Sequence, residues 1–298
     1  MFKNLIDKFK AADIVGKFIY ANVAIYIFVL LIAVFSVLFN LGGNADAVVR
    51  YLELPASLPL LLQRPWSVIT YMFLHENFMH ILWNMVALYF FGRIFMSFYS
   101  VRHFVGVYLM GGLFGALAFL LSYNLLPYFA SSVSGAFLVG ASASVLAVVV
   151  AAAVRSPEYR INLLFFGSVK LSTFAIVTVA ISVLMLSGGN AGGNFAHLGG
   201  AFAGWFMAYM LNRGWDVTSW VNRPIDWFVT LLKKRPGTKK EKGKFTYSSS
   251  GRNADYEYNA RKKASEAEVD KILEKIKIGG YSSLSDAEKK KLFDASSK

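Results

Sequence analysis

The chain has 298 residues, 56% of them hydrophobic, and its mean hydropathy is +0.47. This composition is too apolar for an ordinary soluble domain, and the absence of cysteine excludes disulfides, thiolate–metal sites and a cysteine nucleophile. Residues 1–211 carry 11 basic and 6 acidic side chains, whereas residues 212–298 carry 20 and 12. The net charge of +13 therefore lies mostly in a polar tail. This favours attachment to an anionic membrane surface over binding of nucleic acid.

Most of the chain before this tail consists of long apolar segments. Residues 1–17 are amphipathic, and we expect them to lie at the membrane interface. A membrane-spanning helix needs about 20 mostly apolar residues. Six segments meet or approach that length: 18–41, 78–98, 103–123, 140–155, 168–187 and 193–211. We therefore predict an all-α polytopic membrane protein with a six-helix domain over residues 18–211.

Basic residues fall in alternate connections of this six-helix domain. They precede the first span and separate the second from the third and the fourth from the fifth: Lys3, Lys8, Lys10, Lys17, Arg93, Arg102, Arg155, Arg160 and Lys170. The loops after the third and fifth spans carry no charge. Positive residues mark the cytoplasmic side of a membrane protein. Both termini are therefore predicted to be cytoplasmic.

The stretch FLHENFMH resembles the zinc-protease pattern H-E-x-x-H, but its second histidine comes one residue late. On a regular helix His75 and His80 would lie about 140° apart, so they cannot both ligate one ion. His80 instead shares a helix face with Asn84, four residues later. We expect no metal at this site, and we expect His75 to be a solvated residue at the edge of the loop.

Polar residues of three predicted spans fall at one depth in the outer part of the membrane. His80 and Asn84 begin the second span, Ser142 begins the fourth and His197 begins the sixth. Buried polar groups are costly in lipid and usually serve function. A serine and a histidine can form a nucleophile and its general base. Ser144 would point about 200° away around the helix, so Ser142 is the stronger candidate.

No acidic residue of the domain is placed to complete a triad, so the residues favour a Ser142–His197 dyad. His80 and Asn84 can donate hydrogen bonds to the oxyanion that forms during acyl transfer. Small residues would let the fourth and sixth helices approach closely, among them Gly140, Gly200 and Gly204.

The stretches RPWSVITYMFLHENFMHILWNM, GAS at 140–142 and AHLGGAFAG at 196–204 resemble the motifs of the rhomboid intramembrane serine proteases. The family carries H-x-x-x-N, G-x-S-G and A-H-x-x-G-x-x-x-G on corresponding spans, so the resemblance covers residues 18–211. It implies the same roles for Ser142, His197, His80 and Asn84, with Gly200 and Gly204 packing the two helices.

The rhomboid resemblance also implies partners and a location. The substrates would be single-span membrane proteins cut near the outer face of a bacterial inner membrane, without a cofactor. Membrane lipids would surround the domain. The outer loops and the fifth span are candidates for the gate that admits substrate.

Two other functions stay open. Ala143 stands where the family pattern has glycine, and Leu146 where many members have an aromatic residue. These differences are compatible with a catalytically silent protein of the same fold that binds membrane clients. A transporter or a metal-binding protein would instead require His75, His80 and His197 to converge.

The polar tail is predicted in two parts. Residues 212–256 read as a basic linker, and residues 257–298 as a small cytoplasmic helical hairpin. The patterns Ser265–Glu268 and Ser285–Glu288 are capping boxes, which mark helix starts. Such a hairpin is too small for much of a core, so it is expected to dock onto a partner or onto the membrane domain.

Overall fold

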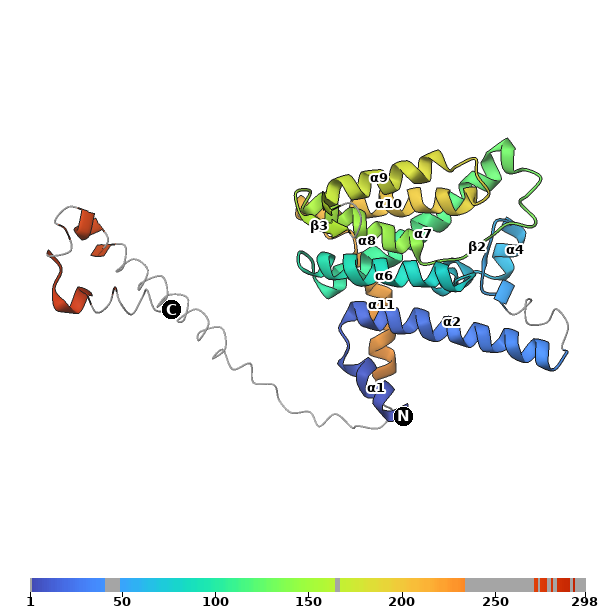
Figure 1. The fold of residues 1–298 in the computed structure, drawn as a ribbon, viewed down its shortest axis with the longest axis horizontal. Helices are drawn as coiled ribbons and strands as arrows, with labels where there is room; N and C mark the ends of the chain where they lie inside the picture. Colours follow the sequence, from blue (N-terminus) through green and yellow to red (C-terminus); the bar gives the residue numbers. More distant parts are fainter. Residues whose placement is uncertain are drawn as a thin grey trace. The chain divides into compact units, whose positions relative to one another are not determined.

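The computed structural model describes residues 2–40, 49–163 and 167–233, and in the tail residues 271–272, 274–277, 280, 283–289 and 292. The chain divides into two compact units, residues 1–234 and 235–298. The first unit is a bundle of helices (Figure 1). Its helices are α1 (Phe2–Ala11), α2 (Ile14–Leu38), α4 (Leu58–Gln63), α5 (Ser67–Thr70), η1 (Tyr71–Phe73), α6 (Phe78–Met96), α7 (Val101–Leu125), η2 (Pro127–Phe129), α8 (Ser142–Arg155), α9 (Leu171–Leu184), α10 (Ala191–Asn212) and α11 (Ser219–Lys233).

Each predicted span coincides with one helix of the bundle, namely α2, α6, α7, α8, α9 and α10. Among the described helices, three are long and apolar enough to cross a membrane: α2, α6 and α7. Helices α8 and α9 are apolar but shorter. The outer faces of the bundle expose large apolar side chains, such as Phe28, Val37 and Leu184. A surface of this kind suits lipid rather than water.

The first long helix starts earlier than the sequence predicts. Helix α2 begins at Ile14 instead of residue 18, because the carboxylate of Asp13 accepts a hydrogen bond from the Gly16 amide at 2.7 Å. This is an N-cap, which satisfies a backbone donor that the helix itself leaves free. Asp13 also lies 3.7 Å from Arg93, near the end of α6.

Helix α8 lies at the centre of the bundle. It contacts α6, α7, α9 and α10, and every residue from Ala143 to Ala153 is buried. Its sequence, SASVLAVVVAAAVR, consists mainly of alanine and valine, so neighbouring helices can approach it closely. Fourteen residues of helix span only about 21 Å, which is less than the roughly 30 Å core of a bilayer.

Glycine brings α10 into backbone contact with α8. A Cβ atom added at Gly200 would lie 2.1 Å from the carbonyl oxygen of Ala143, and one at Gly204 would lie 2.2 Å from that of Ala147. Real Cβ atoms do not come that close to a backbone oxygen. Helix α7 also approaches α8 closely, since a Cβ atom added at Gly111 would lie 2.5 Å from the Cβ atom of Ala147. No other residue type fits these positions without moving a helix.

Two small antiparallel sheets, which the all-α prediction did not include, join parts of the bundle. Strand β1 (Leu54–Pro55) in the first loop pairs with β2 (Phe137–Leu138), just before α8. Strands β3 (Arg160–Leu163) and β4 (Gly167–Lys170) form a hairpin between α8 and α9. Strands of two to four residues are too short to produce a clear alternation in the sequence.

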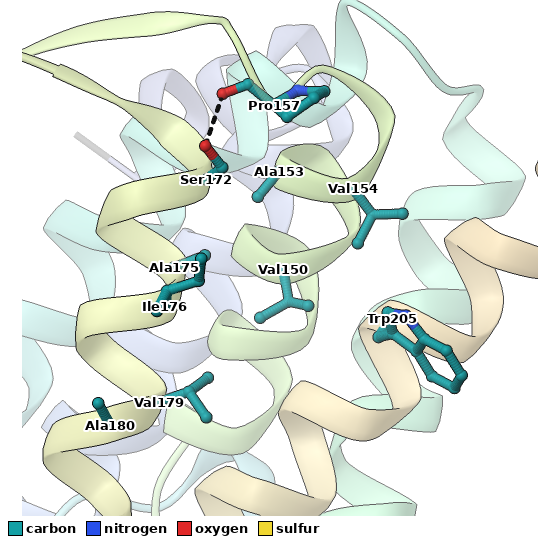
Figure 2. Close-up of a pocket in the computed structure, with 10 residues that line it drawn as sticks. All are labelled: Val150, Ala153, Val154, Pro157, Ser172, Ala175, Ile176, Val179, Ala180 and Trp205. Carbon is teal, nitrogen blue, oxygen red and sulfur yellow. Dashed lines mark hydrogen bonds between the residues drawn. The ribbon is translucent and has the colours of Figure 1, made fainter.

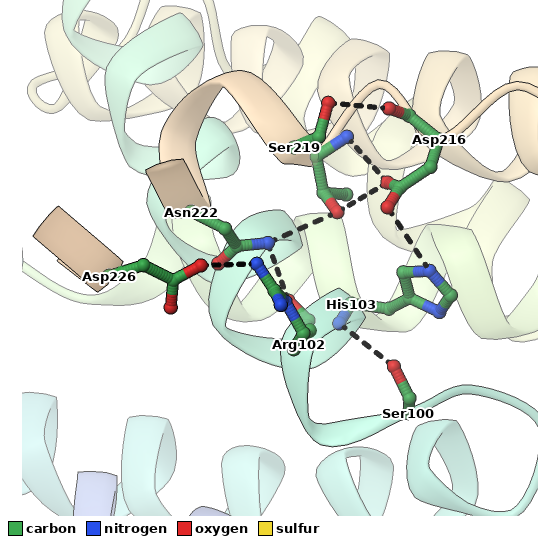
Figure 3. Close-up of polar contacts among 8 residues, drawn as sticks. Ser100, Arg102, His103, Asp216, Ser219, Asn222 and Asp226 are labelled. Carbon is green, nitrogen blue, oxygen red and sulfur yellow. Dashed lines mark hydrogen bonds and ion pairs between the residues drawn. The ribbon is translucent and has the colours of Figure 1, made fainter. Parts of the chain in front are cut away.

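Helix α11 lies within residues 212–256, so the prediction of a linker over that whole segment was wrong. Figure 3 shows how α11 and the turn before it meet the start of α7. The Asn222 amide donates to the carbonyl of Arg102 at 3.1 Å, and the Arg102 guanidinium pairs with Asp226. Asp216 lies 3.8 Å from His103. The later part of the predicted linker lies outside the described residues.

Only short stretches of the second unit are described, and they are partly helical. The second predicted capping box is present: the Ser285 amide donates to Glu288 at 2.8 Å, and the Glu288 amide donates to the Ser285 hydroxyl at 3.4 Å. The ammonium group of Lys275 lies 2.9 Å from the Glu288 carboxylate. The first capping box, at Ser265, lies outside the described residues. The hairpin as a whole therefore stays a prediction.

His75 is buried rather than solvated, which corrects the sequence-based expectation. Its side chain precedes α6 and is only 7% exposed. Its ring packs edge-on against that of His80, with 5.1 Å between the centroids. Neither ring nitrogen has a hydrogen-bond partner among the described residues. Burial, and secondarily the nearby His80, lower the pKa of His75 to about 4.

Replacing Gly204 by alanine is expected to destabilise the bundle. The new Cβ would meet the Ala147 carbonyl, and that backbone cannot move without shifting α8. We expect a loss of about 1–3 kcal/mol, measured as a lower unfolding midpoint in detergent. Gly189→Ala is the matched control, because open space surrounds that glycine. Equal midpoints for the two variants would contradict the close contact.

Acidification is expected to destabilise the protein through His75. Between pH 6.5 and 4 the unfolded chain binds a proton at this residue and the folded chain does not. Stability therefore falls as the pH is lowered through this range. The shift of the unfolding midpoint between pH 7.5 and 5 should be smaller in His75→Phe than in the wild-type protein. An identical shift in both would show that His75 does not contribute.

Candidate active site

Ser142 is the first residue of α8 and follows a turn that only glycine adopts easily. Gly140 has a φ angle of +126°, a conformation that side chains disfavour. The turn is held from behind, because the Gly140 amide donates to the Tyr71 carbonyl at 3.0 Å. Helix α8 has no side-chain N-cap. The amide groups of its first turn are therefore free to stabilise negative charge near Ser142.

His197 lies in the second turn of α10 and faces Ser142. Its Nε2 atom is 2.8 Å from the Ser142 Oγ atom, which is a hydrogen-bonding distance. The residues are 55 positions apart in the chain. The glycine contacts between α8 and α10 bring them together, since Gly200 is one helical turn from His197.

The other ring nitrogen of His197 also has a partner. Its Nδ1 atom lies 3.3 Å from the hydroxyl oxygen of Ser182, near the end of α9. Ser182 is buried, and its hydroxyl donates to the Thr178 carbonyl at 3.2 Å. The imidazole is thus held on both sides by serine hydroxyls that come from different helices.

His80 approaches Ser142 across Gly140. The position that a Cβ of Gly140 would occupy is 2.8 Å from His80 Nε2 and 3.6 Å from Ser142 Oγ. Glycine at this position therefore keeps open the space between the imidazole and the hydroxyl. The main chain at His80 is fixed by Asn77, whose side chain accepts from the His80 amide at 2.9 Å.

Asn84 lies one turn after His80 on the same helix, α6. One of its two amide hydrogens goes to the His80 carbonyl at 2.9 Å. The second can serve a ligand, since a side-chain amide has two donors. Asn84, Ser142 and His197 all line one cavity.

This cavity has a volume of about 230 Å³ and lies among α6, α8, α9 and α10. Its walls are mainly apolar, and include Trp83, Phe91, Leu146 and Phe174. Leu146, one turn after Ser142 on α8, is therefore a wall of this space. A cavity with apolar walls and a few convergent polar groups is typical of a binding site for a substrate.

Two other polar residues near the site do not join the Ser142–His197 pair. Ser144 is buried, and its hydroxyl has no partner among the described residues. Its Cα lies 3.0 Å from the position that a Cβ at Gly111 would take, so this turn of α8 rests on α7. The ring of His75 packs against that of His80. Within the part of the chain that the structure describes, no group of three His, Asp or Glu side chains is placed to hold a metal ion.

The sequence-based reasoning missed two residues that support the site. Ser182 could have been found from its spacing to Thr178, because two polar residues four positions apart share one face of an otherwise apolar helix. Tyr71 gave no comparable signal. Its phenol donates to the Gly112 carbonyl at 2.6 Å, and burial raises its pKa, so it stays neutral. It fixes the first loop against α7, beside the turn that carries Ser142.

A second and larger groove does not reach Ser142. It has a volume of about 540 Å³ and is lined almost entirely by apolar side chains of α8 and α9, with Trp205 of α10 (Figure 2). Ser172 closes one end of it by donating to the Pro157 carbonyl at 2.9 Å. Helix α9 is therefore incompletely packed against the bundle in this half.

Comparison with known proteins identifies the family. A rhomboid domain model matches residues 62–214, about half of the chain, and a family of unknown function, DUF6576, matches residues 252–298. RHOMBOID-like protein 12, mitochondrial, of Arabidopsis thaliana is 29% identical over 144 residues, which cover 45% of this chain and 43% of that protein. The match thus spans less than half of that relative. By the extent of the domain match, the chain belongs to the rhomboid family, whose members are generally intramembrane serine proteases.

Proposed function

We propose that this rhomboid protein is an intramembrane serine endopeptidase that uses a Ser142–His197 dyad. The observation that carries the proposal is the 2.8 Å contact between Ser142 Oγ and His197 Nε2. It lies on the wall of a cavity and at the start of a buried helix. A serine that is only a helix cap has no need of a histidine at this distance.

In the proposed reaction, Ser142 Oγ attacks the carbonyl carbon of the scissile peptide while its proton passes to His197 Nε2. The tetrahedral intermediate collapses, the C–N bond breaks, and His197 returns the proton to the leaving amine. Water then attacks the serine ester and gives a proton to His197. That proton returns to Ser142 Oγ as the acid product leaves.

The negative charge on the intermediate requires donors that are already in place. We assign this role to His80, to the second amide hydrogen of Asn84 and to the free amides at the start of α8. Gly140 supports the assignment, because a side chain there would fill the space between His80 and Ser142.

The proposed substrates are single-span membrane proteins cut near the outer face of the membrane. In this arrangement α2, α6, α7, α8, α9 and α10 all span the bilayer, with both termini in the cytoplasm of a bacterium. The shortness of α8 supports cleavage near the outer face. A helix of about 21 Å can start below the outer boundary of the bilayer and still reach its inner side. Lys8 and Lys10 of α1 and the basic residues at the α8 and α9 connection would then lie at the cytoplasmic surface.

A client-binding protein without protease activity would have the same fold. Ala143, which stands where the family pattern has glycine, does not favour this alternative, because its Cβ packs against Gly115 on α7.

The tail supports neither function. We propose a cytoplasmic partner for it because the predicted hairpin is too small to form much of a core by itself.

Loss of either dyad member is expected to abolish cleavage. Purified protein should cut a model single-span substrate, and both Ser142→Ala and His197→Ala should lower the rate by roughly 10³-fold or more. Ser144→Ala is the control, since it removes a hydroxyl from the same helix. Cleavage that survives Ser142→Ala but not Ser144→Ala would overturn the assignment. A wild-type protein that binds substrate without cutting it would favour the client-binding function.

The oxyanion assignment gives a separate prediction. His80→Ala and Asn84→Ala should each lower kcat by about 10²-fold with little change in KM, because their hydrogen bonds strengthen only in the transition state. Asn124→Ala is the matched amide control, since Asn124 bonds the Ala56 carbonyl away from the site. A rise in KM at constant kcat would instead assign His80 and Asn84 to substrate binding.

A further inference from the structure

We propose that Ser182 is a positioning residue for the base, so that the site is a chain of three side chains, Ser142, His197 and Ser182. This inference rests on the proposed protease function. Neither the family match nor the dyad assigns Ser182 a role. Its hydroxyl lies 3.3 Å from His197 Nδ1, on the side of the ring opposite Ser142.

The direction of each hydrogen bond among these three side chains follows from the one that Ser182 makes to the backbone. The Ser182 hydroxyl has one proton, which it donates to the Thr178 carbonyl at 3.2 Å. Ser182 Oγ can then only accept from His197, which requires a proton on Nδ1. A neutral imidazole has one N–H group. Nε2 is therefore unprotonated and accepts from Ser142.

This arrangement selects the tautomer that the reaction needs. A general base must present an unprotonated nitrogen to the nucleophile, and in serine proteases the partner of the second ring nitrogen secures this. Ser182 does so without a charge, which suits a site among apolar helices where a carboxylate would be costly. The side chain is 3% exposed, so water does not compete for its lone pairs.

The same contact remains useful after proton transfer. When His197 takes the proton of Ser142, both ring nitrogens carry hydrogen, and Nδ1 continues to donate to Ser182 Oγ. A neutral acceptor stabilises the imidazolium less than a carboxylate does. The expected loss on removing it is therefore that of a single neutral hydrogen bond, about tenfold in rate. The 3.3 Å distance is long for such a bond, as is common before substrate binds.

The kinetic test compares two serines of the same helix. Ser182→Ala should lower kcat for a single-span substrate about tenfold with little change in KM, and Ser182→Thr should restore most of it by returning the hydroxyl. Ser172→Ala removes a similar hydroxyl–carbonyl bond at the other end of α9 and should leave kcat unchanged. Equal losses in Ser182→Ala and Ser172→Ala would overturn the proposal in favour of a structural role.

A spectroscopic test needs no activity. The chain has four histidines, so nitrogen-15 NMR of histidine-labelled protein can resolve their tautomers, and the His197 signals are assigned by their loss in His197→Gln. We expect the proton of His197 on Nδ1, and a partial shift to Nε2 in Ser182→Ala. A wild-type His197 that carries its proton on Nε2 would overturn the proposal even if the variants fail to fold.

These experiments separate the inference from the proposed function. Cleavage that is lost in Ser142→Ala but unchanged in Ser182→Ala would leave the dyad intact and remove only Ser182 from it. Cleavage that persists in Ser142→Ala would overturn the protease assignment, whatever the tautomer of His197.

Discussion

The close contact between α8 and α10 is the constraint on which the rest of the site depends. Ser142 and His197 come from different helices, and the 2.8 Å bond between their side chains forms where the two helices lie in backbone contact. Gly200 and Gly204 make this possible, one and nearly two turns beyond the histidine. In a membrane, helix association depends on such packing rather than on the hydrophobic effect. Packing and chemistry therefore share the same short stretch of α10.

The position of Ser142 depends on a second constraint, the turn before α8. Gly140 combines a left-handed backbone with the absence of a side chain, and both are needed: the first directs Ser142 into the helix start, and the second admits His80. The pairing of β1 with β2 and the Tyr71 carbonyl hold this turn from the side of the first loop. The loop is thus part of the support of the site as well as a connection.

The sequence allowed the positions of the six apolar helices and the residues of the Ser142–His197 contact to be predicted. Length and hydrophobicity determine where apolar helices form. If successive helices cross the membrane in opposite directions, every second helix starts on the same side, and polar residues in their first turns share a depth. Contacts that depend on side-chain direction across helices could not be predicted in the same way. The spacing of Ser182 to Thr178 marks a polar face of α9 but does not show that this face meets His197. His75 looked solvated because it follows an apolar run at the edge of a loop. Helix α11 was missed because it contains Pro224 and is followed directly by a basic run, so that the whole segment was assigned to a linker.

The bond between Ser182 and His197 ties the orientation of the imidazole to the position of α9. Few side chains of this helix are buried, and the groove beside it leaves its other half poorly supported. A polypeptide that enters by pushing α9 aside would separate the two side chains, and the imidazole would lose its orientation at the moment of widest opening. Entry and hydrolysis would then be successive events. If the protein is the proposed protease, a peptide bond that passes the site while the helix is displaced would be spared, and only one retained until the helix returns would be cut.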